Sequence, residues 1–391
     1  MATEKGYILW LPSWYPNPIT PYDGDFIQRH AKAVSAFIPV HVFYIIRDKE
    51  RQMTRSVRFL EKSEGNLTET IIYYNSLHCG IRIFDRMLSQ TKFWWLYRKH
   101  VKKLFREKGF PELVHVHIVY KAGLIARWIN KKFGIPYLLT EQWTVHLPEA
   151  KPNINELPFT EQHLISKIMD HTRLVLPVSA YLGKEMKKHW PGIRFEVIPN
   201  VVNHEIFFPG EKEPSPLLRL IHISTLTWQK DPESLLKAVK VVKQRGIPVK
   251  LDLFGPPHRV QHLIHELDIA AVVYLHGEVP QTELAGFLRN SDALVLYSRY
   301  ETFGCVIIEA NACGVPVIVS DTRLMHELVE EGKNGFFVPP DNYMALADAI
   351  QLFFENKHKT NPQEIARTTA KYSYEKVGKM FLEIYNRFLE G

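Results

Sequence analysis

Apolar and polar residues alternate along the chain in a pattern that predicts strands and helices in turn. In the first half, short apolar runs predict buried strands at 7–11, 40–46, 113–117, 137–140 and 174–178. Amphipathic stretches between them predict helices at 26–37, 92–108, 123–133, 161–170 and 180–189. Apolar strands separated by helices are typical of a parallel sheet with helices on its two faces.

The second half repeats this alternation with its own set of strands. They are expected at 219–224, 249–255, 272–276, 293–297, 317–320 and 335–338. Between the two series lies a proline- and charge-rich stretch, 209–216, whose composition is that of a linker. The chain therefore predicts an α/β protein of two doubly wound, Rossmann-like domains, followed by an amphipathic C-terminal helix.

Length and composition fit this picture and narrow the class of protein. The chain has 391 residues, 46% of them hydrophobic and 23% charged, as expected for two globular domains. No apolar run approaches the roughly 18–20 residues that cross a membrane, and no signal-peptide pattern precedes the first strand. The three cysteines, Cys79, Cys305 and Cys313, have no metal-binding spacing, and an odd number argues against a disulfide framework. We expect a cytoplasmic protein with no cofactor and no metal site.

Charge is distributed unevenly between the two halves. Residues 1–200 carry 29 Lys or Arg and 18 Asp or Glu, whereas the remainder carries 20 and 24. A basic half favours an anionic partner, such as nucleic acid, a membrane surface or an acidic substrate, although excess lysine also keeps proteins in solution. No zinc module or aromatic-basic sheet motif is present, so nucleic acid is not expected.

The segment around Glu301 and Glu309 carries the most chemical information. It follows the predicted strand at 293–297, passes through a loop ending in Phe303-Gly304, and then becomes helical. Open α/β sheets bind ligands at the carboxyl ends of their strands, and a helix N-terminus attracts an anion such as a diphosphate. Two carboxylates on either side of such an anion site suit a nucleotide-sugar.

This segment resembles the signature of retaining GT-B glycosyltransferases of the group 1 family, glycosyltransferase family four. The features that carry the resemblance are two Glu separated by seven residues, Phe-Gly after the first Glu, and the exit Gly314-Val315-Pro316-Val317. The resemblance implies a GT-B fold, in which two Rossmann-like domains face a central cleft. It also implies an acceptor-binding domain at 1–203, completed by a returning helix at 372–391, and a nucleotide-sugar-binding domain at 204–371.

The resemblance assigns donor-binding roles in the second domain. Glu309 would hold the ribose of the nucleotide and Glu301 the hydroxyls of the sugar, and Lys230 would bind the diphosphate. Thr225 stands where the family usually has an arginine, so one cation of the usual pair is missing. The remaining donor-binding positions are Phe303, Gly304, Cys305, Gly255 and Val279.

In the first domain the resemblance is weaker and leaves choices open. Gly24 stands where the family has a Gly-Gly pair near the donor phosphates, and His117 belongs to a matching His-x-His on the acceptor side. In the loop 140–146, the family's catalytic histidine corresponds either to Gln142 or, by a shift of role, to His146. We expect His146 to act with Glu301 and Lys230, and Gln142 to lie on the acceptor side.

The basic and aromatic stretch 93–106 also has two interpretations. Its apolar residues recur at helical spacing, which favours a helix packed on the sheet. Alternatively, Trp94, Trp95, Arg98 and Lys102 rest on an anionic bilayer, which would make the protein peripheral to the inner face of the membrane.

The expected activity is retaining transfer of a sugar from a nucleotide-diphosphate donor to a saccharide or lipid-linked acceptor, as in surface polysaccharide synthesis. One alternative within the same fold is a nucleotide-sugar 2-epimerase. From a different class, a non-catalytic two-domain sugar-binding protein would also have facing α/β domains. A dehydrogenase is disfavoured, because no Gly-x-Gly-x-x-Gly follows the first strand.

Overall fold

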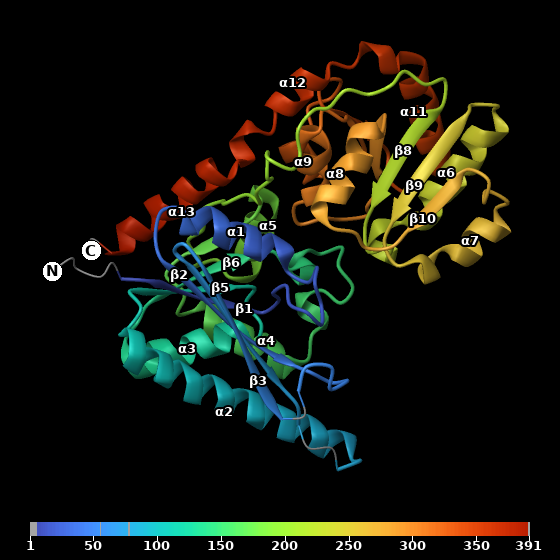
Figure 1. Ribbon diagram of the computed structural model, residues 1–391. Coiled ribbons are helices and arrows are strands. Elements are labelled where there is room, and N and C mark those ends of the chain that lie inside the picture. Colours follow the sequence, from blue (N-terminus) through green and yellow to red (C-terminus); the bar gives the residue numbers. More distant parts are fainter. Residues whose placement is uncertain (1–5, 55, 77–78, 390–391) are drawn as a thin grey trace.

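The computed structural model describes residues 6–54, 56–76 and 79–389, and it consists of two α/β domains (Figure 1). Each domain is a sheet with helices on both faces, as the alternating pattern predicts. Residues 1–5 and 390–391, which belong to the predicted first domain and its returning helix, lie outside the described ranges. No helix within those ranges is long and apolar enough to cross a membrane.

The first sheet has seven strands in the order β3-β4-β2-β1-β5-β6-β7. All neighbours are parallel except β3 and β4. Every side chain of β1 and β5 is buried, which accounts for their continuous apolar sequences. The strands are β1 Ile8–Pro12, β2 Val40–Arg47, β3 Val57–Glu64, β4 Leu67–Tyr74, β5 Leu113–His117, β6 Tyr137–Glu141 and β7 Val175–Pro177.

Helices cover both faces of the first sheet. The helices are α1 Asp25–Ser35, α2 Arg82–Lys108, α3 Ala122–Phe133, α4 Phe159–Met169 and α5 Ala180–His189, with short 3-10 turns at Thr144–His146 and Ile154–Glu156. The last helix, α13 Tyr374–Leu389, returns from the second domain and packs beside α1 on one face; α2 to α5 cover the other. A Cβ at Gly378 would lie 2.4 Å from the carbonyl oxygen of Ala33, so a glycine is needed where α13 meets α1.

The second sheet has six parallel strands in the order β10-β9-β8-β11-β12-β13. The strands are β8 Leu218–Ile223, β9 Val249–Phe254, β10 Val273–His276, β11 Ala293–Leu296, β12 Val317–Ser320 and β13 Gly335–Val338. The helices are α6 Pro232–Gln244, α7 Gln261–Glu266, α8 Gln281–Asn290, α9 Cys305–Ala312, α10 Met325–Leu328, α11 Tyr343–Asn356 and α12 Pro362–Arg367. The 3-10 turns are Trp228–Lys230, Pro257–Arg259, Lys357–Lys359 and Ala370–Tyr372.

The chain crosses between the domains twice, and the two crossings lie side by side. The Val202 N–H donates to the carbonyl of Tyr372 at 3.0 Å, and Val202 and Ser373 form a parallel β-bridge. The proline-rich stretch predicted as a linker follows the first crossing and lies along the second domain, where Lys212 Nζ is 2.8 Å from the Asp292 carboxylate. Its composition therefore reflects an extended surface segment and not the hinge.

Two features of the first domain differ from the predicted elements. The hairpin of β3 and β4 was not predicted, although the two residues between the strands, Gly65 and Asn66, are a hairpin signal. Six of the eight residues of β3 are exposed and four are charged, so it has no long apolar run. Helix α2 begins at Arg82 instead of residue 92, because its first turns carry exposed apolar side chains that break the amphipathic pattern.

Candidate active site

A cavity of about 390 Å³ lies between the two domains, at the carboxyl ends of their strands. Its walls come from the loops after β1 and β6 of the first domain and after β8 to β11 of the second. A ligand in this cavity would therefore touch both domains. Ten predicted site residues line it: Gln142, Thr225, Lys230, Gly255, Val279, Glu301, Phe303, Gly304, Cys305 and Glu309.

The N-terminus of α9 forms one wall of the cavity. Gly304 precedes the helix with φ +87°, a left-handed conformation that favours glycine, and this turn brings the start of α9 to the cavity. Unpaired N–H groups in a first helical turn attract anions. Burial raises the pKa of the neighbouring Cys305 thiol to about 12, so the thiol is neutral at pH 7. Cys305 therefore presents a neutral thiol to the cavity.

Lys230 and Glu301 form an ion pair through Nζ and Oε1, although they belong to different loops. The Ser298 hydroxyl also donates to Oε1 of Glu301 at 2.9 Å. The two loops are held together by a further hydrogen bond, from Gln229 Nε2 to the carbonyl of Tyr300 at 3.0 Å. Both charged side chains are mostly shielded from solvent. The loops after β8 and β11 thus present a cation and a carboxylate side by side.

Glu309, one turn inside α9, is paired with an arginine of the first domain. Arg29 Nη1 lies 2.6 Å from Oε1 of Glu309, and its Nη2 lies 2.9 Å from Oδ2 of Asp25. Burial opposes the charge on Arg29, but the two carboxylates outweigh it and raise the pKa of Arg29 above its usual value. Sequence reasoning missed Arg29, because its spacing from Asp25 indicates only an ordinary surface pair within a helix.

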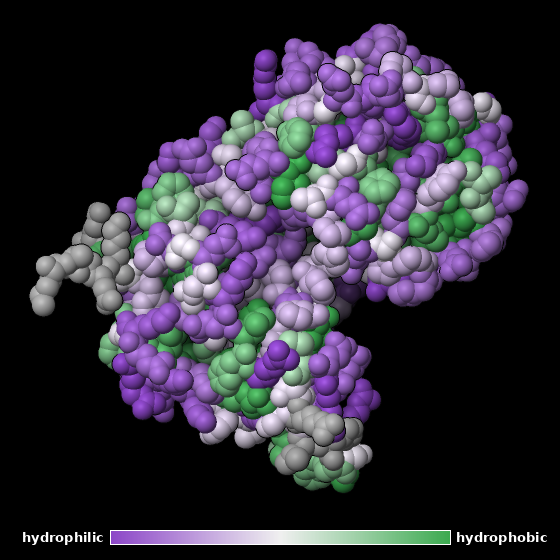
Figure 2. All heavy atoms as spheres, viewed as in Figure 1, coloured by the Kyte–Doolittle hydropathy of each residue, from purple (hydrophilic) through white to green (hydrophobic). Residues whose placement is uncertain are grey.

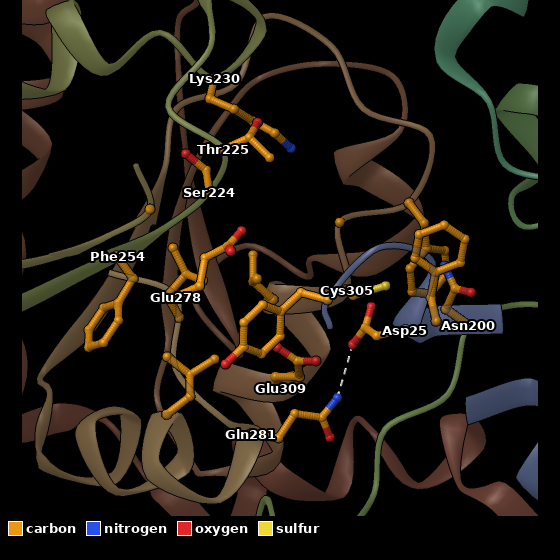
Figure 3. A pocket seen from close by; sticks show the side chains of 18 of the residues that line it. Asp25, Asn200, Ser224, Thr225, Lys230, Phe254, Glu278, Gln281, Cys305 and Glu309 are labelled. Atoms are coloured by element: carbon orange, nitrogen blue, oxygen red, sulfur yellow. Dashed lines mark hydrogen bonds between the residues drawn. The ribbon is translucent and has the colours of Figure 1, made fainter. Parts of the chain in front are cut away.

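Other contacts also join the two domains around the cavity. Gln281 Nε2 of α8 donates to Oδ2 of Asp25 at 3.1 Å (Figure 3). The Ser179 hydroxyl, which also caps α5, donates to the carbonyl of Thr302 at 2.8 Å. The Glu327 carboxylate of α10 accepts hydrogen bonds from two backbone N–H groups in the first turn of α5. The domains are therefore in contact on both sides of the cavity.

The ends of β9 and β10 form the far end of the cavity. Gly255 has φ +141°, and a Cβ there would lie 2.2 Å from the carbonyl oxygen of Ser224, so only glycine fits. The rings of Phe254 and His276 stack with centroids 4.5 Å apart. Val279 lies beyond β10 on the same wall. This end combines the apolar Phe254 and Val279 with the Glu278 carboxylate, whereas the other end carries Lys230.

A second cation lies near Thr225, the position where the resembling family has an arginine. Arg259 Nη1, from the turn after β9, donates to the carbonyl of Thr225 at 3.1 Å. Arg259 is exposed and was not predicted, since nothing in its local sequence marks it. Within the described part of the chain, no group of three or more His, Cys, Asp or Glu is arranged to hold a metal ion.

Two histidines predicted at the site do not line the cavity. His117 is fully buried, with its ring 3.9 Å from that of Trp10, and burial lowers its pKa well below the usual value. Alternate residues of a strand point to one face, so His115 and His117 both face the core under α13 instead of the cleft. His146 is also fully buried, and its Nε2 lies 3.3 Å from Glu141 Oε2. Both positions are corrections to the prediction.

Of the two other predicted site residues in the first domain, Gln142 lines the cavity and Gly24 does not. Gln142 lines the cavity; its Oε1 accepts a hydrogen bond from Asn200 Nδ2 at 3.0 Å, and its Nε2 is buried with no partner. Of the two choices in the 140–146 loop, Gln142 is the one at the cavity. Gly24 is not a lining residue; it has φ +71°, and a Cβ there would lie 2.6 Å from the Trp14 backbone. Gly24 therefore permits a tight turn, and Asp25 beside it reaches the cavity.

Models of two protein families match the chain over most of its length. The model described as Glycosyl transferases group 1 matches residues 203–374, and the model described as Glycosyltransferase Family 4 matches residues 39–206. The first covers the loops of the second domain that line the cavity, and the second covers most of the first domain.

The chain is also similar in sequence to an inositol phosphate glycosyltransferase and to a probable sucrose-phosphate synthase. The chain is 26% identical over 304 residues to D-inositol 3-phosphate glycosyltransferase of Paenarthrobacter aurescens, covering 72% of this chain and 74% of that protein. It is 27% identical over 332 residues to a probable sucrose-phosphate synthase of Thermosipho melanesiensis, covering 78% and 77%.

Solved structures share the fold. Sucrose-phosphate synthase from Thermosynechococcus elongatus superimposes with a TM-score of 0.79 over 99% of this chain and all of that one, at 19% identity. Anabaena Alr3699/HepE, solved with UDP and glucose, gives 0.69 over 98% and 99%, at 16% identity. The two facing domains and the cavity between them are those of a GT-B enzyme. The chain belongs to the group 1 glycosyltransferases, family four, and is a glycosyltransferase.

Proposed function

We propose that this enzyme transfers a sugar from a nucleoside-diphosphate donor, with retention at the anomeric carbon, to a saccharide or lipid-linked acceptor. The observation that carries the proposal is the convergence of Lys230, Glu301, Glu309 and the N-terminus of α9 on one cavity between the domains. These groups supply cations or N–H donors for a diphosphate, and carboxylates for hydroxyl groups.

The donor would lie along the second domain from the ends of β9 and β10 to the start of α9. The base would fill the space beside Gly255 and Val279, and the ribose hydroxyls would donate to the Glu309 carboxylate. The diphosphate would contact Lys230 and the N–H groups at Gly304. The exposed guanidinium of Arg259 would supply the positive charge that Thr225 lacks.

The chemical step follows from the charge that develops as the donor breaks. When the bond between the anomeric carbon and the diphosphate oxygen breaks, its electron pair stays on the diphosphate, which gains negative charge. Fixed cations and N–H groups stabilise this charge without reorganising. The acceptor hydroxyl bonds to the anomeric carbon from the same face, and its proton passes to the leaving phosphate oxygen. Glu301 would hold the sugar hydroxyls, and no protein nucleophile and no metal ion takes part.

The acceptor would enter from the first domain, where the Gln142 amide is directed to the cavity. We expect a saccharide or a glycan on a lipid carrier at the cytoplasmic face of a membrane, as in polysaccharide synthesis. The excess of Lys and Arg in residues 1–200 supports an anionic acceptor or surface.

A thermal-shift screen with UDP-, GDP- and ADP-sugars tests the donor class directly. UDP-glucose is the first donor to test, because the Anabaena neighbour was also solved with it. The anomeric configuration of the product, read by NMR, tests retention. If no nucleotide or nucleotide-sugar raises the melting temperature, the proposed donor site is wrong; an inverted product would disprove only the stereochemistry.

A further inference from the structure

The first half of α2 carries an exposed apolar surface that the proposed reaction does not use. Five large apolar side chains there expose 43–72% of their area to solvent. We call this group the α2 stripe; it consists of Ile83, Phe84, Met87, Leu88 and Trp95. Single exposed apolar residues are common on proteins, but a contiguous group of large ones marks an interaction site.

Four members of the stripe share one face at the start of the helix, and Trp95 lies two turns further along. Ile83 and Met87 are four residues apart, as are Phe84 and Leu88, so both pairs lie on neighbouring turns of one side. The side of α2 opposite Met87 packs on the core of the first domain through residues such as Leu96. Figure 1 shows the start of α2 at the outer end of the first domain, and Figure 2 shows hydrophobic surface in that region. The stripe is therefore convex and open, unlike a groove that receives a peptide.

Most of the cations of α2 follow the stripe: Arg82, Arg86 and Lys92 lie within residues 82–95, and six more Lys or Arg lie between residues 98 and 108. Helix α2 carries nine Lys or Arg and two Asp or Glu. Lys99 Nζ lies 4.7 Å above the ring of Trp95, and the Arg98 guanidinium lies 5.6 Å from that of Trp94. Tryptophan beside lysine or arginine is typical of side chains at the boundary between lipid headgroups and acyl chains.

We propose that the α2 stripe docks the enzyme on an anionic bilayer, with the apolar side chains among the acyl chain ends and the cations of α2 at the phosphates. The charge selects this occupant over a second copy of the chain, because two such helices facing each other would bring their positive charges together. The positive charge also favours an anionic over a zwitterionic surface. Each Lys or Arg near an anionic leaflet strengthens binding by about 1 kcal/mol, which is roughly a fivefold gain in affinity.

The position of α2 relates this surface to the cleft. Helix α2 follows β4, which is parallel to β2, and β2 is parallel to β1, so α2 begins at the carboxyl edge of the first sheet. The loops that carry Asp25 and Gln142 to the cavity leave the same edge. Docking would thus bring the acceptor side of the cleft near the bilayer; this last step rests on the proposed function, whereas the docking itself does not.

Sedimentation with vesicles of phosphatidylcholine, with and without phosphatidylglycerol, tests the proposal on the full chain. The protein should bind the anionic vesicles at low salt and dissociate as salt screens the cations. The double variant Ile83→Glu/Phe84→Glu should lower the affinity at least tenfold. The matched control is Leu352→Glu, an equally exposed leucine on α11 of the second domain, which should bind as the wild type does.

Two further measurements separate docking from misfolding and from the donor site. Melting temperatures and nucleotide-induced shifts of the double variant should equal those of the wild type, because the changed side chains are exposed and outside the cavity. Brominated lipid should quench tryptophan fluorescence less in Trp95→Phe than in the wild type. The proposal is overturned if the wild type ignores anionic vesicles at low salt, if the double variant binds equally well, or if the double variant instead dissociates a dimer in sedimentation velocity.

Discussion

Arg29 of α1 and Glu309 of α9 form a buried ion pair across the cleft, with Nη1 and Oε1 2.6 Å apart. The two residues are separated by 280 positions in the chain, and each belongs to a different domain. Because Glu309 is also the proposed ligand of the nucleotide ribose, this pair connects donor binding to the contact between the domains.

Breaking this pair should destabilise the protein. Removal of one partner from a buried pair usually costs about 3–5 kcal/mol, because the other charge is left without its partner. We expect Arg29→Met to lower the free energy of unfolding by that order in chemical denaturation, and Arg29→Met/Glu309→Leu to cost less than the two single changes together. The exposed pair Arg387 and Glu196 is the control, expected to contribute under about 1 kcal/mol. If the double variant loses as much unfolding free energy as the two single variants together, the pair has no coupling energy.

Glu309→Gln should weaken nucleotide binding while keeping the shape of the side chain. A hydrogen bond to a charged group contributes roughly 1.5–3 kcal/mol, so the affinity measured by calorimetry should fall about tenfold or more. Unchanged affinity in a folded variant would remove Glu309 from the donor site.

Lys230→Ala should lower turnover more than it weakens donor binding, since negative charge on the diphosphate grows in the transition state. Steady-state kinetics at saturating donor, beside calorimetry with the intact donor, separates the two effects. Lys237→Ala is the matched control, because Lys237 lies on α6 and pairs with Glu233 of the same helix. A collapse of affinity with normal turnover would make Lys230 a binding residue only.

Arg259→Gln should raise the donor dissociation constant several-fold, and the loss should shrink as salt increases. The structural reason is that the Arg259 guanidinium lies at Thr225, where the family has its own arginine. Thr225→Arg in the same background should restore affinity. The exposed Arg367 on α12 serves as control through Arg367→Gln. If Arg259→Gln binds the donor normally, the diphosphate relies on Lys230 and α9 alone.

Thiol labelling should distinguish the cysteines by their surroundings. Burial raises the pKa of Cys305 and of Cys313 to about 12, so the reactive thiolate is about one part in 10⁵ at pH 7. The thiolate fraction grows with pH, and labelling of both should begin only in strongly alkaline solution. Iodoacetamide at neutral pH should therefore modify the exposed Cys79 first, as peptide mass mapping would show. Rapid labelling of Cys305 with loss of activity would contradict this environment.

The sequence predicts best those features that are local in the chain. Lys230 and Glu301 each follow an apolar strand, so the edge of the sheet to which they belong could be predicted without coordinates. Arg29 could not be found in this way, because its partner is distant in sequence and only the packed domains bring them together.

The histidines show a different limit of sequence reasoning. His115 and His117 stand at the end of a strand, which suggested the cleft, but their spacing of two also places both on one face of the sheet. In the structure α13 covers that face, and Nδ1 of His115 lies 2.5 Å from the hydroxyl oxygen of Tyr385. Helix α13 comes from the far end of the chain. Its position on the sheet determines which histidines are buried in the core.

The bridge between Val202 and Ser373 has a further consequence. The second domain leaves and rejoins the first at adjacent positions, so it is an insertion into the first domain and a continuous piece of chain. We therefore predict that residues 204–371 can be removed as one segment, whereas the first domain needs both ends of the chain to be whole. A genetic fusion that joins Val202 directly to Ser373 would test whether the first domain folds without the inserted second domain.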